Sequence, residues 1–285
     1  MSAKKVLQKQ YFDQAYIDQK SKLHLFLQID KKNLHACYLA PTENQFVGLE
    51  SYSIGDHQEW GTTLEPLRSI LDHLDRNHKK VSLTVCSPYF VQVPSALFSE
   101  EAAMDFFAYN HKRPIAKSDL LTHAIEGASI QLAFEFPFLI KNLFQSRFNL
   151  GQIIHESAPF LEYTANRKRA AKETVYLEVH QNHFQIGIYK DGELHLYNQF
   201  KYATVEDFMY FFLYTLEQLE LDRETLELKL SGMVEKDSPI YRMLFTYIRK
   251  LELISRPKVI QESQVLSQLG ESHFFNLFNQ YLCES

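Results

Sequence analysis

Glycine is scarce in this chain, with 9 among 285 residues, about half of the usual frequency of roughly 7%. Because glycine has no Cβ atom, it suits loops whose backbone amides closely approach a phosphate group. A chain with so little glycine builds few such loops, and it contains no GxGxxG, GxSxG or HExxH motif. The dinucleotide-binding, nucleophile-elbow and zinc-protease motifs are therefore excluded.

Cysteine, basic charge and long apolar runs are also in short supply. The three cysteines lie far apart, which is typical of reduced thiols in a cytoplasmic protein. Thirty Lys and Arg residues against 35 Asp and Glu residues give a net charge of −5, which predicts no nucleic-acid partner. No run approaches 18 apolar residues and the N-terminus lacks the apolar stretch of a signal peptide, so we expect no membrane span.

The densest basic cluster consists of Arg167, Lys168, Arg169 and Lys172. We interpret it as a solvated helix end, and the alternative is a site for an anionic partner.

Alternating apolar and polar residues predict strands in both halves of the chain. In the first half Thr62 and Glu65 form a capping-box pattern before an amphipathic helix, and in the second half Thr204 caps a long helix that precedes another over Ser238–Arg249. The predicted strands are Leu23–Asp30, Leu34–Ala40, Phe46–Ile54 and Val81–Cys86, then Thr174–His180, His183–Tyr189, Glu193–Tyr202 and Leu226–Ser231.

Both halves thus have the order strand, strand, strand, helix, strand, helix. Aligning Asp30 with His180 and Cys86 with Ser231 superposes the two patterns. This predicts an α/β protein with two mixed sheets, flanking helices and a cleft between the halves. We expect a first domain at 1–170 with an inserted α+β subdomain at about 99–155, and a second domain at 171–285 with a helical tail. The stretch before the boundary predicts helices over Glu100–Asn110, Phe138–Phe148 and near Pro159–Arg169, and strands over Leu120–Ile125, Ser129–Phe134 and Gln152–His155.

Several segments carry a resemblance that covers most of the chain. The segments are YFDQAY, QIDKKNLHACYL, CSPYFVQVPSALFSEEAA, YNQFKYATVEDFMYFFLYTLEQLELD and LSGMVEKDSPIYRMLFTYIR. They resemble a family of bacterial proteins of unknown function to which an actin-like ATPase fold is assigned, within the superfamily of actin, sugar kinases and chaperone ATPases. The resemblance implies a duplicated ribonuclease H-like (actin-like ATPase) fold that binds nucleotide between its two domains.

The superfamily has three nucleotide signatures, and this chain departs from each. In the Asp-x-Gly turn after the first strand, Asp30 is present but Lys32 replaces the glycine. In the matching turn of the second half, His180 replaces the aspartate and Asn182 the glycine. In the Gly pair on which adenosine packs, Gly232 is followed by Met233. Because such turns bring amides to phosphate and carboxylates to hydrated Mg²⁺, the departures remove most of that machinery.

We therefore expect a catalytically degenerate protein that acts as a protein-binding or scaffold module, with no catalytic residue, cofactor or resident metal. An unknown protein partner is expected at the inserted subdomain. The alternative is an ATP-binding phosphotransferase or ATPase with Mg²⁺, whose atypical site uses Asp30, Lys31, Lys32 and Gly232. A third hypothesis is a metal site at His180 and His183, although exposed turn histidines explain this pair more simply.

Two further features have both structural and functional interpretations. His155-Glu156-Ser157 is typical of a helix N-terminus rather than of a catalytic group. Two dense aromatic groups favour burial, with a partner surface as the alternative. They are Phe208, Tyr210, Phe211, Phe212 and Tyr214, and Phe134, Phe136, Phe138, Phe144 and Phe148.

Overall fold

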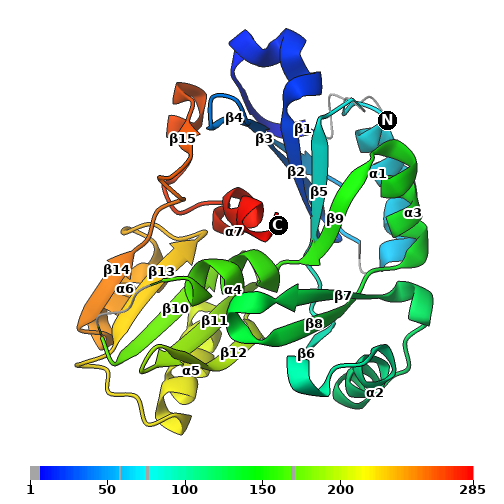
Figure 1. Cartoon of the computed structure of the whole chain (residues 1–285). Coiled ribbons are helices and arrows are strands. Elements are labelled where there is room, and N and C mark those ends of the chain that lie inside the picture. Colours follow the sequence, from blue (N-terminus) through cyan, green and yellow to red (C-terminus); the bar gives the residue numbers. More distant parts are fainter. Residues whose placement is uncertain (1–6, 58, 75–76, 168–170, 285) are drawn as a thin grey trace. The chain divides into compact units, whose positions relative to one another are not determined.

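A computed structural model describes residues 7–57, 59–74, 77–167 and 171–284, and its two main sheets share one strand order (Figure 1). The first contains the path β4-β3-β2-β5-β9, and the second is β12-β11-β10-β13-β14. In each sheet, the first three of these strands along the chain are paired antiparallel, each with the next. The two later strands run parallel to the first of the three, which is β2 in one sheet and β10 in the other. The predicted repeat of strands is thus confirmed. Their bounds are β2 His24–Ile29, β3 Asn33–Ala40, β4 Gln45–Ser53, β5 Lys80–Val85 and β9 Leu150–His155, then β10 Glu173–Val179, β11 His183–Lys190, β12 Glu193–Lys201, β13 Glu227–Gly232 and β14 Lys250–Leu253.

The chain divides into two units, which we describe separately. The division falls inside α4 (Ser157–Ala165), earlier than the predicted boundary at residues 170 and 171. Side chains of α4 pack on the second sheet, where Thr164 and Tyr189 are joined by a hydrogen bond of 2.8 Å. The first unit consists of Met1–Ala158 and Val259–Gln268, and the second of Pro159–Lys258 and Leu269–Ser285.

The first sheet buries both faces of β2 at Phe26, which is fully buried between Leu25 and Leu27. Leu25, Leu27 and Ile29 are fully buried and share a core with Leu67 and Leu71 of α1 (Leu64–Leu71). In this sheet, β1 (Leu7–Phe12) and β15 (Gln261–Glu262) were not expected from the sequence, and both pair with β4. The strands at Phe90–Pro94 and Lys250–Leu253 were not expected either. The strand β15 has two residues and pairs with a strand far away in the sequence. An alternating pattern of neighbouring residues cannot predict such a pairing.

A small antiparallel sheet, β6-β8-β7, forms the insert together with α2. Its own core includes Val93, Phe107 and Ala133. The predicted range of 99–155 needs correction at both ends, because β6 pairs with β8 in the insert and β9 pairs with β5 in the main sheet. The elements are β6 Phe90–Pro94, α2 Glu100–His111, β7 Leu120–Ile125 and β8 Ile130–Glu135, followed by α3 Phe138–Arg147.

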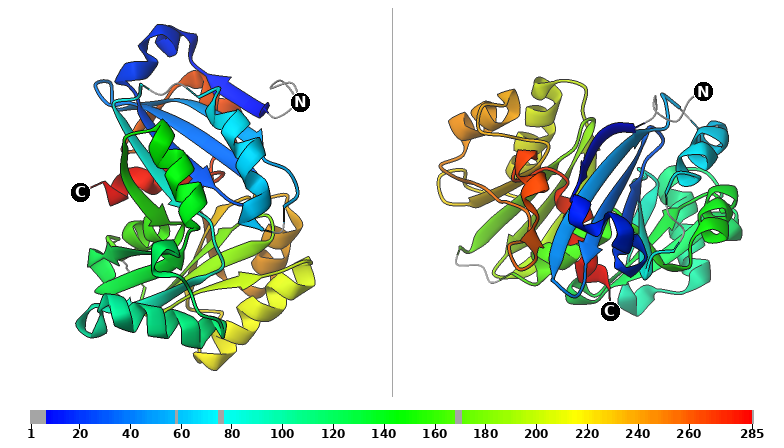
Figure 2. Two further views of the ribbon diagram at one scale, coloured as in Figure 1. Left: turned by 90° about the vertical axis from the view of Figure 1, so that its right-hand side faces the viewer. Right: turned by 90° about the horizontal axis from the view of Figure 1, so that it is seen from above.

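In the second unit, α5 (Val205–Gln218) and α6 (Pro239–Tyr247) pack together beside the sheet (Figure 2). Thr204 caps α5, as predicted, and Asp207 completes a capping box with it. The expected helical tail contains α7 (Phe275–Asn279), whose five residues are all buried.

Two details of the sequence interpretation were wrong. Thr62 does not cap a helix, since a 3-10 turn over Trp60–Thr63 comes first and the Thr62 hydroxyl donates to the Glu59 carbonyl at 2.9 Å. The fourth strands align two residues differently, because the amides of Cys86 and Met233 bond equivalent carbonyls of β2 and β10. Cys86 therefore corresponds to Met233 rather than to Ser231.

Candidate functional site

Asp30 closes the turn between β2 and β3 with its own carboxylate. Its Oδ1 atom accepts hydrogen bonds from the Lys32 amide at 2.5 Å and from the Asn33 amide at 2.7 Å. The Asp30 amide donates to the Asn33 carbonyl at 3.0 Å. These bonds make a side-chain-supported turn of the kind that Asp forms readily. Two amides of the turn that would have to face a phosphate are thus already bonded to a carboxylate.

The two lysines of this turn lie together with Asp30, as their sequence positions require. The Lys32 ammonium pairs with the Asp56 carboxylate at 2.7 Å, with both side chains exposed. This hydrogen bond raises the pKa of Lys32 and lowers the pKa of Asp56. The Lys32 carbonyl accepts hydrogen bonds from the amides of Ile54 and Gly55, and Lys31 is half-buried beside it. The Lys32 backbone and side chain are therefore held by the edge of the sheet.

Cys86 lies at the end of β5, next to the strand that ends at Asp30. The side-chain amide of Gln28 donates to its sulfur at 3.2 Å. Burial, followed by the nearby carboxylates of Glu156 and Asp30, raises the pKa of the Cys86 thiol well above its ordinary value. A thiol that stays protonated is a poor nucleophile.

His155 shows how the same edge of the first sheet leads into α4. Its Nε2 atom lies 2.7 Å from the Ser87 carbonyl, and its Nδ1 atom lies 2.6 Å from the Ser157 hydroxyl and accepts the Ser157 amide at 3.2 Å. A carbonyl only accepts, so Nε2 carries the proton and Nδ1 is the acceptor. The ring is fully buried and stacks on Phe90. Helix α4 begins at Ser157, so this segment lies at a helix N-terminus as predicted.

The second turn, between β10 and β11, contains two stacked imidazoles. The rings of His180 and His183 lie 4.3 Å apart and are nearly parallel, at 6°. The His180 amide donates to the His183 carbonyl, and the Tyr202 hydroxyl donates to the His180 carbonyl. The His183 Nδ1 atom lies 3.0 Å from the Asn182 side-chain oxygen. An imidazole therefore stands where the superfamily places a carboxylate.

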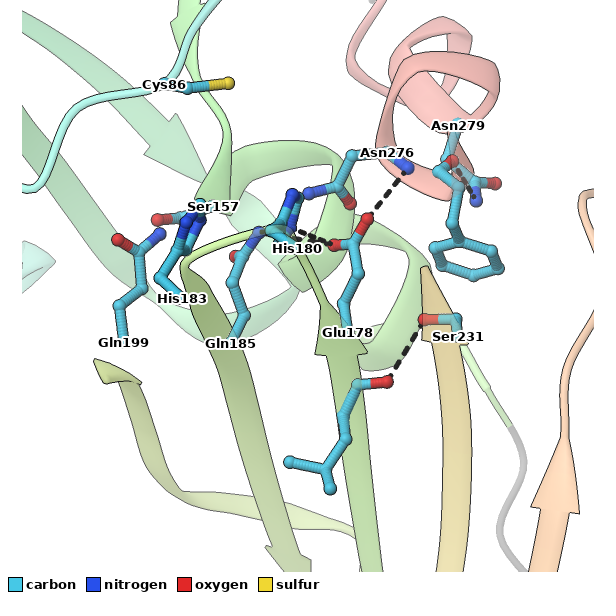
Figure 3. Close-up of polar contacts among 12 residues, drawn as sticks. Cys86, Ser157, Glu178, His180, His183, Gln185, Gln199, Ser231, Asn276 and Asn279 are labelled. Carbon is cyan, nitrogen blue, oxygen red and sulfur yellow. Dashed lines mark hydrogen bonds and ion pairs between the residues drawn. The ribbon is translucent and has the colours of Figure 1, made fainter. Parts of the chain in front are cut away.

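Glu178 lies behind this turn and was not singled out from the sequence. Its carboxylate is buried at 1% exposure, accepts the Gln185 amide at 3.2 Å and the Asn276 backbone amide at 3.2 Å, and lies 3.5 Å from His180 Nε2 (Figure 3). The Tyr197 hydroxyl donates to Gln185 in turn. The available signal was a carboxylate within a run of buried strand residues, which is uncommon unless it is paired.

His180 and His183 offer imidazole nitrogens of the kind that bind a divalent metal. His180 Nε2 also faces both Glu178 and Gln185, at 3.5 and 3.2 Å. Within the second unit, His180 and Gln185 therefore form a polar cluster with the buried Glu178 carboxylate.

Gly232 ends β13 in contact with a second segment of the same unit. Its φ is +90°, and a Cβ atom there would lie 2.2 Å from the Val179 carbonyl oxygen. The Gly232 amide donates to the Ser272 carbonyl at 3.1 Å, and the Ser272 hydroxyl lies 3.0 Å from the Gly232 carbonyl and 2.8 Å from that of Val234. We call residues 269–283 the C-terminal strap. The strap thus lies against the strand end at which the superfamily holds adenosine.

Buried Arg256 fixes the beginning of the strap. Its guanidinium donates to the carbonyl of Gly270, and it lies 4.9 Å from the centre of the Phe278 ring. The Arg256 backbone amide also bonds the Glu271 carbonyl at 2.8 Å. The strap is therefore anchored at both Arg256 and Gly232.

The duplicated strand order and these turns can be compared with known proteins. The model of a family described as "Protein of unknown function (DUF3822)" matches residues 13–251. The chain belongs to this family. A comparison with curated proteins finds no match.

Solved structures establish the fold of this family member. A Bacteroides thetaiotaomicron protein with an actin-like ATPase fold and unknown function is 20% identical, with a TM-score of 0.72 over 83% of this chain and 92% of that chain. A chain of a PilM-PilN type IV pilus biogenesis complex is 10% identical, with a TM-score of 0.57 over 92% of this chain and 99% of that chain. The DUF3822 chain thus has the actin-like ATPase fold, as the resemblance implied.

The candidate residues of this family member fall into two groups. Asp30, Lys31 and Lys32 share one turn of the first unit, and Gly232 lies in the second unit beside the strand of His180. Of the basic cluster, Lys168 and Arg169 lie outside the described residues. No helix in the described ranges has the length and apolar character needed to cross a bilayer.

Proposed function

We propose that this protein is a catalytically degenerate member of the actin-like ATPase fold that works as a protein-binding scaffold. The observation that carries the proposal is the turn at Asp30, where one carboxylate oxygen binds the amides of both Lys32 and Asn33. A phosphate would have to displace an anionic group that the chain itself holds in place.

The contacts of Gly232 support the same conclusion from the second unit. Its amide and carbonyl are both bonded to Ser272, so an adenosine would have to displace the C-terminal strap. Burial of α7 within the strap opposes that displacement, because exposing apolar side chains costs free energy.

The insert offers the partner surface that we favour. Its helix α2 presents Phe106 and Tyr109 to solvent, with Tyr109 at 84% exposure, and the preceding turn exposes Leu97. Exposed apolar groups gathered in this way are typical of binding surfaces. The PilM-PilN type IV pilus biogenesis complex offers a precedent, because a chain of similar fold is part of a complex there.

Calorimetric titration with MgATP tests the loss of nucleotide chemistry. We expect no binding in the micromolar range and no phosphate release. Submicromolar binding or measurable turnover would overturn the proposal.

Comparative co-purification from the native cell tests the scaffold role. We expect one partner to be retained by the wild-type chain and lost from a Phe106→Ser/Tyr109→Ser variant. A Tyr247→Ser variant, which changes an exposed aromatic of the second unit, is the matched control. Equal recovery with the insert variant would remove the insert as the partner surface.

We further propose a cytoplasmic location and a partner that is neither nucleic acid nor membrane lipid. Support comes from the three cysteines, which form no disulfide, and from the net charge of −5. Fractionation of the native cell tests the location, and recovery outside the cytoplasm would contradict it.

A further inference from the structure

Helix α5 exposes one continuous face while burying the other. Phe208, Phe212 and Leu216 are buried in the core of the second unit, whereas Tyr210 is 63% exposed and Tyr214 is 50% exposed. At 3.6 residues per turn, the exposed side chains fall within an arc of about 120°. They are Glu206, Asp207, Tyr210, Tyr214, Glu217 and Gln218, which we call the α5 face. The aromatic run of α5 therefore serves both the core and the surface.

The two tyrosines of the α5 face lie side by side. Their ring centres are 6.0 Å apart and the rings are nearly parallel, at 13°. Burying a large aromatic ring is favourable, so a partner that covers these exposed rings would gain binding free energy. A pair of rings held this way offers flat π surfaces to an incoming group, and a cation gains most from such a surface.

The α5 face is also acidic throughout. Helix α5 contains three carboxylates and neither Lys nor Arg. Asp207 is used in the capping box, where it accepts the amides of Ala203 and Thr204. Among the described residues, neither Glu206 nor Glu217 has a cationic partner within 4.0 Å, whereas other exposed carboxylates, such as Glu100 with Lys117, are paired at 2.7 Å.

We propose that the α5 face binds a cationic segment of a partner protein, in which Arg or Lys side chains stack on Tyr210 and Tyr214 and pair with Glu206 and Glu217. Eleven residues separate the two glutamates, so a rise of 1.5 Å per residue puts them about 16 Å apart along the helix. An extended peptide covers that length in about five residues. The fitting segment therefore carries two cations about five residues apart, with Arg between them for the rings.

Charge selects this occupant over the alternatives. A second copy docking face to face would bring the same carboxylates against each other, because a two-fold interface pairs each patch with itself. A wholly apolar partner would bury Glu206 and Glu217 without counter-charges, which is costly. An anionic lipid surface would be repelled. This inference concerns the second unit and does not depend on the insert or on nucleotide binding.

Fluorescence anisotropy with two labelled peptides tests the proposal. One peptide alternates Arg with Leu over nine residues, and the other has Glu in place of each Arg. We expect the intact protein to bind the Arg peptide at least tenfold more tightly than the Glu peptide. Raising the salt from 50 to 300 mM should weaken the Arg complex at least threefold, since it screens surface charge.

Surface variants locate the binding site. We expect Tyr210→Ser/Tyr214→Ser to weaken Arg-peptide binding at least tenfold, and Glu206→Gln/Glu217→Gln to weaken it several-fold and reduce its salt dependence. The matched control is Leu139→Ser on α3, an exposed apolar residue on a helix that carries Lys141 and Arg147 but no carboxylate. It should bind as the wild type does. Circular dichroism checks that each variant stays folded.

Three results would overturn the proposal. Equal binding of both peptides would remove the charge argument, and unchanged binding by the tyrosine variant would place the site elsewhere. A dimer in sedimentation that the tyrosine variant abolishes would identify a second copy as the occupant.

Discussion

Ser272 and Gly232 are joined by hydrogen bonds although 40 residues separate them along the chain. The Ser272 carbonyl accepts the Gly232 amide at 3.1 Å, and the Ser272 hydroxyl lies 3.0 Å from the Gly232 carbonyl. These contacts place the C-terminal strap on the end of β13. They also give Gly232 a structural role that is independent of nucleotide.

We expect Ser272→Ala to lower the free energy of unfolding by about 1–2 kcal/mol, because two buried carbonyls lose a hydroxyl donor. Urea denaturation measures the change. The control is Ser267→Ala, whose hydroxyl also bonds a carbonyl but at an exposed site, and it should cost less than about 0.5 kcal/mol. Equal effects of the two substitutions would contradict the anchoring role of Ser272.

The substitution Gly232→Ala should cost about 3 kcal/mol or more of unfolding free energy. The new Cβ would lie 2.2 Å from the Val179 carbonyl oxygen, at a φ of +90°, so backbone would have to move. Gly192→Ala is the matched control, because its φ is +92° but nothing lies within 4 Å of the added Cβ. The control should cost about 1–2 kcal/mol, from the left-handed conformation alone. If the two variants were equally stable, the close approach to Val179 would be disproved.

Asp30→Ala separates the structural from the nucleotide interpretation of the first turn. We expect it to lower the free energy of unfolding by about 1 kcal/mol, because the Lys32 and Asn33 amides lose their acceptor. Asp30→Asn should be milder, since its side-chain oxygen still accepts. Calorimetry with MgATP should not distinguish Asp30→Ala from the wild type. Nucleotide binding by the wild type that Asp30→Ala abolishes would favour the alternative enzyme.

His35 should make the protein sensitive to mild acid. Burial lowers the pKa of His35 from 6.5 to about 4, so below pH 6.5 the unfolded chain binds a proton that the folded chain refuses. The contribution of His35 is fully present above pH 6.5 and is lost as the pH falls toward 4, at up to about 1.4 kcal/mol per pH unit. Denaturation curves between pH 4 and 7 should show this slope in the wild type and less of it in His35→Gln. The exposed His73→Gln variant should keep the full slope, and a flat wild-type profile would contradict the assignment.

The strands were predictable because their signal is local. The alternation of Leu25, Leu27 and Ile29 requires neighbouring positions alone, and so does the capping box of Thr204 and Asp207. The error at Thr62 has a local cause too, since a 3-10 turn competes with the helix start. The error in aligning Cys86 arose from strand register, which depends on hydrogen bonds to another strand.

The candidate site was only partly predictable. The resemblance to the superfamily's nucleotide signatures singled out Asp30, Lys32, His180 and Gly232 in the sequence. The sequence could not identify Glu178, because a carboxylate inside a strand becomes notable once Gln185 and the Asn276 amide are known to surround it. Contacts between residues far apart in sequence leave no periodic signal.

The sequence by itself determined the duplicated order of elements and the absence of glycine from both turns, since each depends on which residue follows which. The tertiary structure alone decided which groups of this chain bond the backbone at the positions that match the nucleotide signatures. Asp30 bonds the amides of its own turn, and Ser272 bonds Gly232 from the far end of the chain. The sequence shows that a carboxylate or a hydroxyl is present. Which backbone groups it bonds depends on the folded chain.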